Sequence, residues 1–307
     1  MSCTLVPHTS DQPANLSLWL RQQLTGNVRE SPTSLFALID ITRLSQEQHA
    51  ALPEVVSTAL QHHGVNLYAD LEGTILADAG PRLCLVGETD LNDWALAACS
   101  THLVHFMAGY VSLADLAGHL QSLREVTLPG GSQALFRFQD CHVTTHLWPL
   151  LTPSMGNHVL GPLLWWATPD ICGPWHVLSL TPGYRRSAAL RFDRVIYDRL
   201  NDQLLVYTVA DQVREVDAAL LNGMSACQVR SLLRARLDAA RRLGLVLQSD
   251  LALYAVLSLQ LPEGFEHQEP FANAVEQNRR QVSSFGAALD RVTSEQWTIW
   301  NDELANQ

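Results

Sequence analysis

The chain has 307 residues, of which 47% are hydrophobic and 17% charged. This composition excludes a disordered chain, and the length favours two domains. The net charge is −11, from 20 basic and 31 acidic residues, and every basic residue is Arg. Phosphate backbones would be repelled, so nucleic acid is not an expected partner. A Walker-type nucleotide site is excluded as well, because it requires a Lys.

The compartment is inferred from two missing signals. No stretch approaches the roughly 18 to 20 consecutive apolar residues that a membrane helix needs. The opening residues also lack the basic start, apolar stretch and cleavage site of a signal peptide. We therefore expect a cytoplasmic protein that makes no membrane contact. The six cysteines lie far apart without a C-x-x-C pair, so we expect reduced, mostly buried thiols and no disulfide framework.

Residues 1–33 read as a loose polar segment followed by a short helix from Leu16 to Leu24. Residues 34–185 are expected to form an α/β domain around a mixed sheet. Its strands are predicted at 35–40, 65–71, 81–86 and 102–108, with a helix over 91–99 and a hairpin over 124–139. Ser112 is suited to cap the helix that follows it. Residues 149–183 are rich in Trp, Pro and Gly, which predicts an irregular but well packed segment.

Residues 186–307 are expected to form an all-helical lobe. Apolar residues recur there at three- and four-residue intervals, and Pro is nearly absent before Pro262. Ser225 and Gln228 resemble a capping box for a helix that ends at Gly244. Further helices are predicted over 250–261, 270–291 and 295–304. The predicted fold class is thus α+β, an N-terminal α/β lobe with a central sheet followed by a helical C-terminal lobe.

The usual signatures of catalysis are missing. No G-x-S-x-G elbow and no G-x-G-x-x-G loop occurs in the sequence, so a Ser hydrolase and a dinucleotide-binding fold have no support. We therefore expect no catalytic residues and no cofactor.

The twelve histidines raise the question of a metal site. His142 and His146 have the H-x-x-x-H spacing that places two ligands on one helix face, and Cys141 or His158 are possible third ligands. The pair lacks the intervening Glu of H-E-x-x-H enzymes, so we favour hydrogen-bonded histidines over a metal site. His102 and His105 are expected on one strand and on opposite faces of it, which also prevents a shared ion.

Arg137 alternates with Phe136 and Phe138 on a predicted strand. This alternation places both aromatic rings on one face and the guanidinium on the other. We expect an ion pair between Arg137 and Asp140 or Asp40, which would hold the fold together.

Five short segments resemble, in order, the adaptor chaperones of bacterial type VI secretion, which carry the domain of unknown function 4123. They are LFALID (35–40), GPRL (80–83), HLQSL (119–123), FRFQD (136–140) and Gly161-Pro162. Asp40, Pro81, Arg137 and Asp140 are the residues that define this motif. The sequence departs from the family where Cys141 and His142 follow FRFQD, because Pro and a basic residue are usual there, and where Gln121 replaces Arg.

The resemblance implies a cytosolic protein that binds a toxic effector and loads it onto the tip of the VgrG spike, without catalysis. Arg and exposed aromatic side chains dominate interface energetics, so the candidate partner-binding residues are Arg185, Arg186, Trp297 and Trp300. Packing of the two Trp into a core is the alternative. Two other functions stay open, an immunity-type protein that neutralises a toxin and a metal-dependent hydrolase that uses His142 and His146.

Overall fold

The computed structural model of the chain describes residues 3–6, 12–25, 33–78, 80–187 and 189–298. The chain divides into two compact units, residues 1–201 and 202–307, which are described separately. Unit 1 contains an antiparallel sheet and unit 2 is helical, so the predicted α+β class is confirmed.

Unit 1 is built on a seven-stranded sheet with the order β1-β9-β8-β5-β2-β4-β3. Its strands are β1 Cys3–Val6, β2 Ser34–Ile39, β3 Val65–Asn66, β4 Arg82–Val86, β5 Val104–Gly109, β8 Leu163–Asp170 and β9 Gly173–Ser179. All of these strands pair antiparallel, so the expectation of a mixed sheet is wrong. Apolar runs such as LFALI indicate burial on both faces but carry no information on strand direction.

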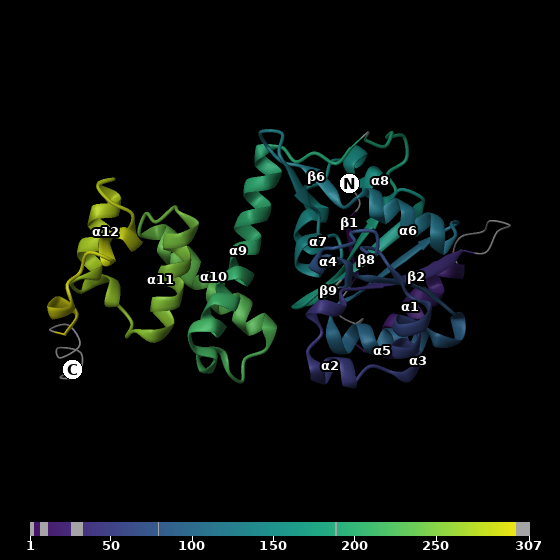
Figure 1. Cartoon of the computed structure of the whole chain (residues 1–307), viewed down its shortest axis with the longest axis horizontal. Helices are drawn as coiled ribbons and strands as arrows, with labels where there is room; N and C mark the ends of the chain where they lie inside the picture. Colours follow the sequence, from purple (N-terminus) through teal and green to yellow (C-terminus); the bar gives the residue numbers. More distant parts are fainter. Residues whose placement is uncertain (1–2, 7–11, 26–32, 79, 188, 299–307) are drawn as a thin grey trace. The chain divides into compact units, whose positions relative to one another are not determined.

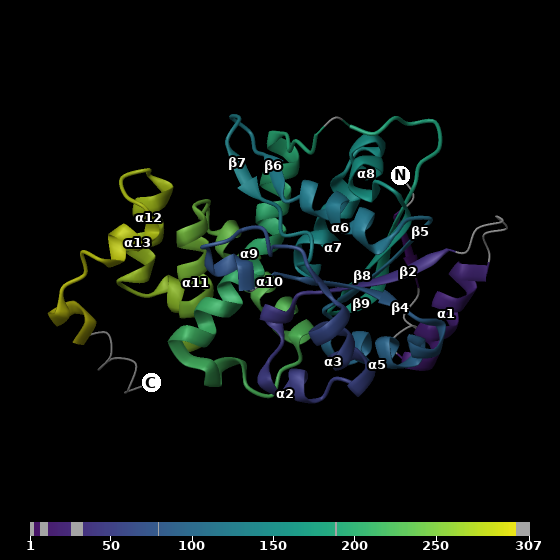
Figure 2. The same ribbon diagram turned by 45° about the vertical axis from the view of Figure 1, so that its right-hand side comes forward.

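Helices cover both faces of this sheet, as Figures 1 and 2 show. One face carries α1 Pro13–Thr25, α3 Glu54–Thr58 and α5 Leu91–Thr101, and the other carries α6 Leu113–Ser122, α7 Cys141–Leu147 and α8 Pro153–Leu160. Side chains alternate along β2, so Leu35 and Ala37 pack in the core beneath Leu20 and Trp94. Phe36 is buried on the opposite face.

The segment 149–183 is regular, contrary to expectation. It contains α8 and the hairpin of β8 and β9, which lies between β1 and β5 in the sheet. Pro169 falls where the β8–β9 register shifts between Thr168 and Asp170, which is a position in a sheet that tolerates Pro. By contrast, the predicted strand over 65–71 is reduced to β3. The predicted hairpin forms a separate pair of short strands, β6 Glu125–Thr127 and β7 Gln133–Leu135.

The predicted boundary at 185/186 precedes the division at 201/202 in the structure, because the segment around Leu190 and Phe192 still packs on unit 1. Thr127 bridges to this segment, with its N–H donating to Leu190 O (3.1 Å) and its carbonyl accepting from Phe192 N (2.9 Å). Phe192 stacks edge-on against Phe136 at a centroid distance of 6.2 Å. At the N-terminal end, α1 packs on α5 through Leu16 and Leu20, so this helix belongs to unit 1 as well.

Unit 2 has its own apolar core. It contains the C-terminal part of α9 Arg194–Asp217, with α10 Ala226–Arg242, α11 Gln248–Gln260, α12 Phe271–Arg279 and α13 Phe285–Leu289. The capping box predicted at Ser225 and Gln228 is present. The single helix predicted over 270–291 is wrong. Gln281 has a left-handed backbone (φ 58°), which ends α12, and Ser284 caps α13 as a new helix.

Within the described ranges, no helix combines the length and apolarity needed to cross a bilayer.

Candidate functional site

Two buried carboxylates lie where the family-like motifs meet. Asp40 follows β2 and accepts hydrogen bonds from Thr42 N (3.2 Å) and Thr42 Oγ1 (2.6 Å). Asp140 caps α7 and accepts from His142 N at 3.0 Å. Each carboxylate therefore stabilises the first turn of the helical segment after it.

Two arginines neutralise these carboxylates. Arg137 lies 3.3 Å from Asp40 and 3.9 Å from Asp140, so the expected ion pair is present with both partners. Arg43, which the sequence reading missed, lies 2.9 Å from Asp140. The sequence does place Arg43 three residues after Asp40, which was a signal that it could reach the same ion-pair cluster. The carboxylates are buried and the guanidinium groups part-exposed, and together the four residues tie β2 to the start of α7.

A buried polar chain lies beside this cluster. His105 of β5 hydrogen-bonds through Nε2 to Gln139 O (2.9 Å), and its Nδ1 accepts from Trp166 Nε1 (3.3 Å). Tyr68 donates to Gln139 Oε1 at 3.1 Å. The two bonds fix His105 as the neutral tautomer with the proton on Nε2. Burial lowers the pKa of His105 to about 4. His102 is not on the strand as expected but forms the left-handed C-cap of α5.

Among the described residues, one group of side chains could hold a metal ion. Ligand atoms of Asp140, Cys141 and His142 lie within 4.8 Å of one another. His146 and His158, the other predicted ligands, are not part of this group. Burial raises the pKa of the Cys141 thiol to about 12, which opposes the thiolate that a metal requires. Asp140 is occupied by Arg43 and the helix cap, so these residues fit a metal poorly.

The cysteines differ from expectation in part. Cys84 and Cys141 are buried free thiols, as expected. Cys172 and Cys227 each take part in a disulfide, so the expectation of reduced cysteines is wrong for these two.

The nominated partner-binding residues fall in both units, with Arg185 and Arg186 in unit 1 and Trp297 in unit 2. Arg185 and Arg186 are both exposed, and Arg186 also donates to Gly161 O at the end of α8, which gives it a role in the fold. Trp297 is half-buried and packs edge-on against Phe271 at a centroid distance of 5.6 Å, which matches the alternative of core packing. Trp300 lies outside the described residues.

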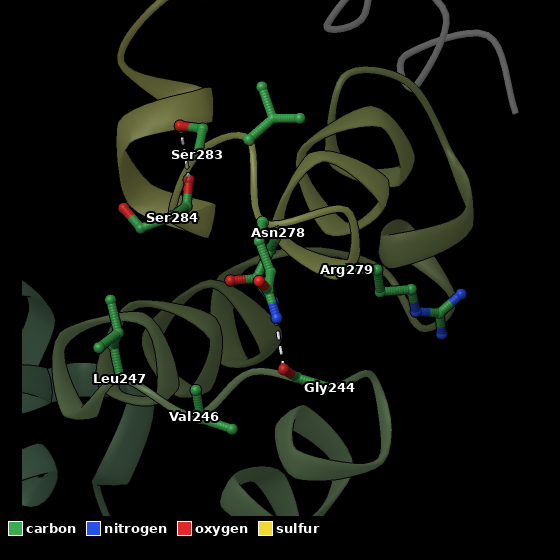
Figure 3. Close-up of a pocket in the computed structure, with 9 residues that line it drawn as sticks. Gly244, Val246, Leu247, Asn278, Arg279, Ser283 and Ser284 are labelled. Carbon is green, nitrogen blue, oxygen red and sulfur yellow. Dashed lines mark hydrogen bonds between the residues drawn. The ribbon is translucent and has the colours of Figure 1, made fainter.

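Unit 2 contains a hollow of about 610 Å³ that the sequence reading missed. It lies between the loop after α10 and the turn between α12 and α13 (Figure 3). Three aliphatic side chains line it while largely exposed, Val246 at 78%, Leu247 at 51% and Val282 at 67%. Residues 245–247 read as ordinary core residues in the sequence, and no pattern reveals that two of them face solvent.

Polar residues fix the walls of this hollow. Asn278 Nδ2 donates to Gly244 O (3.1 Å), a bond visible at the centre of Figure 3. The buried carboxylate of Asp250 accepts from Phe285 N and Gly286 N, each at 3.0 Å, which holds the start of α13 against α11. Arg279 donates to Leu243 O, with its guanidinium turned away from Leu247 and Ser284. The hollow therefore combines exposed aliphatic side chains with hydrogen-bonded polar ones, as protein contacts commonly do.

Comparison with known proteins gives one match. Residues 35–156 match a family described as a domain of unknown function, DUF4123. The match covers less than half of the chain and contains Asp40, Pro81, Arg137 and Asp140. Searches of curated proteins and of solved structures found no significant match.

Proposed function

We propose that this protein is an adaptor that binds a type VI secretion effector and loads it onto the VgrG spike, without catalysing a reaction. The proposal rests on the resemblance of residues 34–166 to the adaptor chaperones, part of which coincides with the DUF4123 match. The chemistry of the matched domain agrees with a binding role, because its buried acids are neutralised by Arg43 and Arg137.

The exposed aliphatic hollow of unit 2 is the observation that favours a protein partner. Exposing Val246, Leu247 and Val282 together costs hydration free energy that covering them with a partner would recover, at roughly 25 cal/mol per Å². The described lining contains no acidic residue and has Arg279 at its rim. An effector segment with an aliphatic side chain and a nearby acid would fit this hollow.

Co-purification tests the proposal. The full-length chain, carrying an affinity tag, should retain the effector encoded in the same type VI cluster and then VgrG. Retention of the effector's isolated toxic domain alone would instead indicate an immunity protein. If neither effector nor VgrG is retained at micromolar concentrations, the adaptor function is wrong.

The hollow is tested by substitution. The double variant Val246→Ser and Val282→Ser should weaken effector binding by about tenfold, because both side chains are exposed and their loss leaves the core intact. The matched control is Met224→Ser, which changes another exposed apolar residue of unit 2 outside the hollow. Isothermal titration calorimetry provides the affinities. Equal affinities of the double variant and the control would place the effector elsewhere.

The metal-dependent alternative makes a different prediction. If Asp140, Cys141 and His142 held zinc, the purified protein would contain about one ion per chain, measurable by plasma mass spectrometry. We expect well below a tenth of an ion, because Asp140 is already paired with Arg43 and Arg137 and caps α7.

A further inference from the structure

Unit 1 has a hollow of its own, at the outer edge of β4. It has a volume of about 510 Å³ and lies between β4, α3 with the following π-helical turn Ala59–His63, and the start of α5. Its lining includes Glu54, Val55, Leu85 and Asp90. It is separate from the hollow of unit 2 and from the ion-pair cluster.

The outer edge of β4 is only partly paired. On its inner side, β2 pairs with all five residues from Arg82 to Val86. On its outer side, β3 pairs with Arg82 and Leu83 alone. Beyond Leu83, no strand in the described chain pairs with β4 on this side.

The hydrogen-bond pattern shows which main-chain groups are left open. Leu67 N donates to Pro81 O at 3.1 Å, so the main chain of Pro81 faces β3. In an antiparallel ladder, alternate residues direct their N–H and C=O to the same side. Leu83 therefore faces Val65 of β3, and Leu85 directs its N–H and C=O outward into the hollow. Among the described residues, neither group of Leu85 has a main-chain partner.

Charge and apolar surface surround this open position. Val55 and Leu85 are 40% and 56% exposed. Glu54 and Asp90 also line the hollow, and neither forms an ion pair with a described basic residue. Asp90 accepts a hydrogen bond from the neutral hydroxyl of Thr89 (2.9 Å). The site thus offers a donor, an acceptor, an aliphatic surface and two carboxylates.

The strand geometry sets the side-chain pattern of an occupant. A residue that pairs with Leu85 places its side chain on the same sheet face as Leu85. The residues on either side of it point to the opposite face. That face carries α3 and α5, because Cys84 and Val86 pack there with Trp94. Glu54 and Asp90 lie at the start of these two helices.

We propose that this edge of β4 binds an extended segment of a partner protein, in which an aliphatic residue flanked by Lys or Arg pairs with Leu85. This mode extends the sheet by one short strand, with affinity from main-chain bonds and specificity from the flanking charges. The surface is independent of the unit 2 hollow and of the proposed effector contact.

Peptide binding to the full-length protein tests the proposal. The probe is a fluorescent acetyl-Ser-Lys-Val-Lys-Ser-amide, and the control peptide carries Glu in place of both Lys. Fluorescence anisotropy should show at least about tenfold weaker binding of the Glu peptide. A Lys peptide with N-methylated valine should also bind at least tenfold more weakly, because methylation removes the main-chain donor. Equal binding of all three peptides would overturn the proposal.

Variants locate the peptide. Leu85→Pro deletes an N–H that faces outward, so the ladder to β2 stays intact while peptide binding is lost. The double variant Glu54→Gln and Asp90→Asn should reduce affinity at least fivefold, and Val282→Ser in unit 2 should leave it unchanged. Wild-type affinity in Leu85→Pro would contradict the assignment.

Amide hydrogen exchange provides a test that needs no variant. In the free protein, the amide of Leu85 should exchange much faster than those of Cys84 and Val86, which face β2. The Lys peptide should slow exchange at Leu85 by at least tenfold. Protection of Leu85 equal to that of its neighbours in the free protein would refute the open edge.

Discussion

At the scale of single residues, the FRFQD segment contributes to stability through Asp140, which is buried and shares Arg137 with a second buried acid, Asp40. A buried carboxylate is tolerated only when it is paired and hydrogen-bonded. Asp140 meets this condition by capping α7 and pairing with Arg43, and Asp40 does so through Thr42 and Arg137. Removing one member leaves its partners unsatisfied, so the cost exceeds that of an exposed pair.

Asp140→Ala should therefore lower the free energy of unfolding by about 2 to 4 kcal/mol, through loss of the helix cap and of the pair with Arg43. Asp198→Ala is the matched control, because Asp198 pairs with Arg194 on the surface and should matter by less than about 0.5 kcal/mol. Urea unfolding followed by Trp fluorescence measures both. Similar losses in the two variants would show that burial of Asp140 adds nothing.

His105 makes stability depend on pH. Burial lowers its pKa from 6.5 to about 4, so below pH 6.5 the unfolded chain binds a proton that the folded chain does not. Stability is therefore full above pH 6.5 and falls toward pH 4, by up to roughly 3 kcal/mol from this group. His105→Gln removes the contribution of this group to the pH dependence. The difference in free energy of unfolding between the wild type and the variant should therefore fall by roughly 2 kcal/mol as the pH is lowered from 7.5 to 4.5. Parallel stability curves would contradict the assignment.

At the scale of elements, α6 and α8 meet at a glycine. Gly161 follows α8 with φ 55°, and an added Cβ would lie 2.2 Å from His119 Nε2. His119 on α6 hydrogen-bonds to Val159 O at 3.0 Å. The approach of these two helices thus requires a residue without a side chain, which accounts for the Gly-Pro segment that the sequence presents as a motif.

Gly161→Ala should consequently destabilise unit 1 by about 1 to 3 kcal/mol, because the methyl group overlaps the His119 ring and the backbone is left-handed. Gly118→Ala, on α6 with no atom within 4 Å of the added Cβ, should instead be neutral or stabilising by up to about 1 kcal/mol. Thermal unfolding of both variants checks the difference in sign. A melting temperature for Gly161→Ala at or above that of the wild type would rule out the overlap.

At the scale of the whole molecule, the described residues of each unit include an apolar core cluster of their own. The first is centred on the sheet with α1, α3 and α5, and the second lies among α10 to α13. A unit that has its own apolar core usually unfolds cooperatively and independently of the rest of the chain.

Phe271→Ala, a fully buried change in the second core, should cost about 3 to 5 kcal/mol. The loss should appear as faster amide exchange in α10 to α13, with the amides of β2 and β5 unchanged. Trp94→Ala in the first core is the converse control, which should accelerate exchange in unit 1 and leave α10 to α13 unchanged. Equal acceleration in both units would show that they unfold together.

The sequence alone determined the features that depend on local chemistry. Helix caps at Ser112 and Ser225 and the apolar strand 35–39 follow from short-range patterns, because capping and side-chain alternation act within a few residues. The pair of Arg137 with Asp40 was expected from the sequence, but it joins segments 97 residues apart, and Arg137 lies beyond the end of β7 and not on the predicted strand. Only the tertiary structure decided strand direction, the hairpin over 163–179 and the exposure of Val246, Leu247 and Val282. Those properties depend on which segments distant in sequence cover one another, and hydrophobicity along the chain does not encode that choice locally.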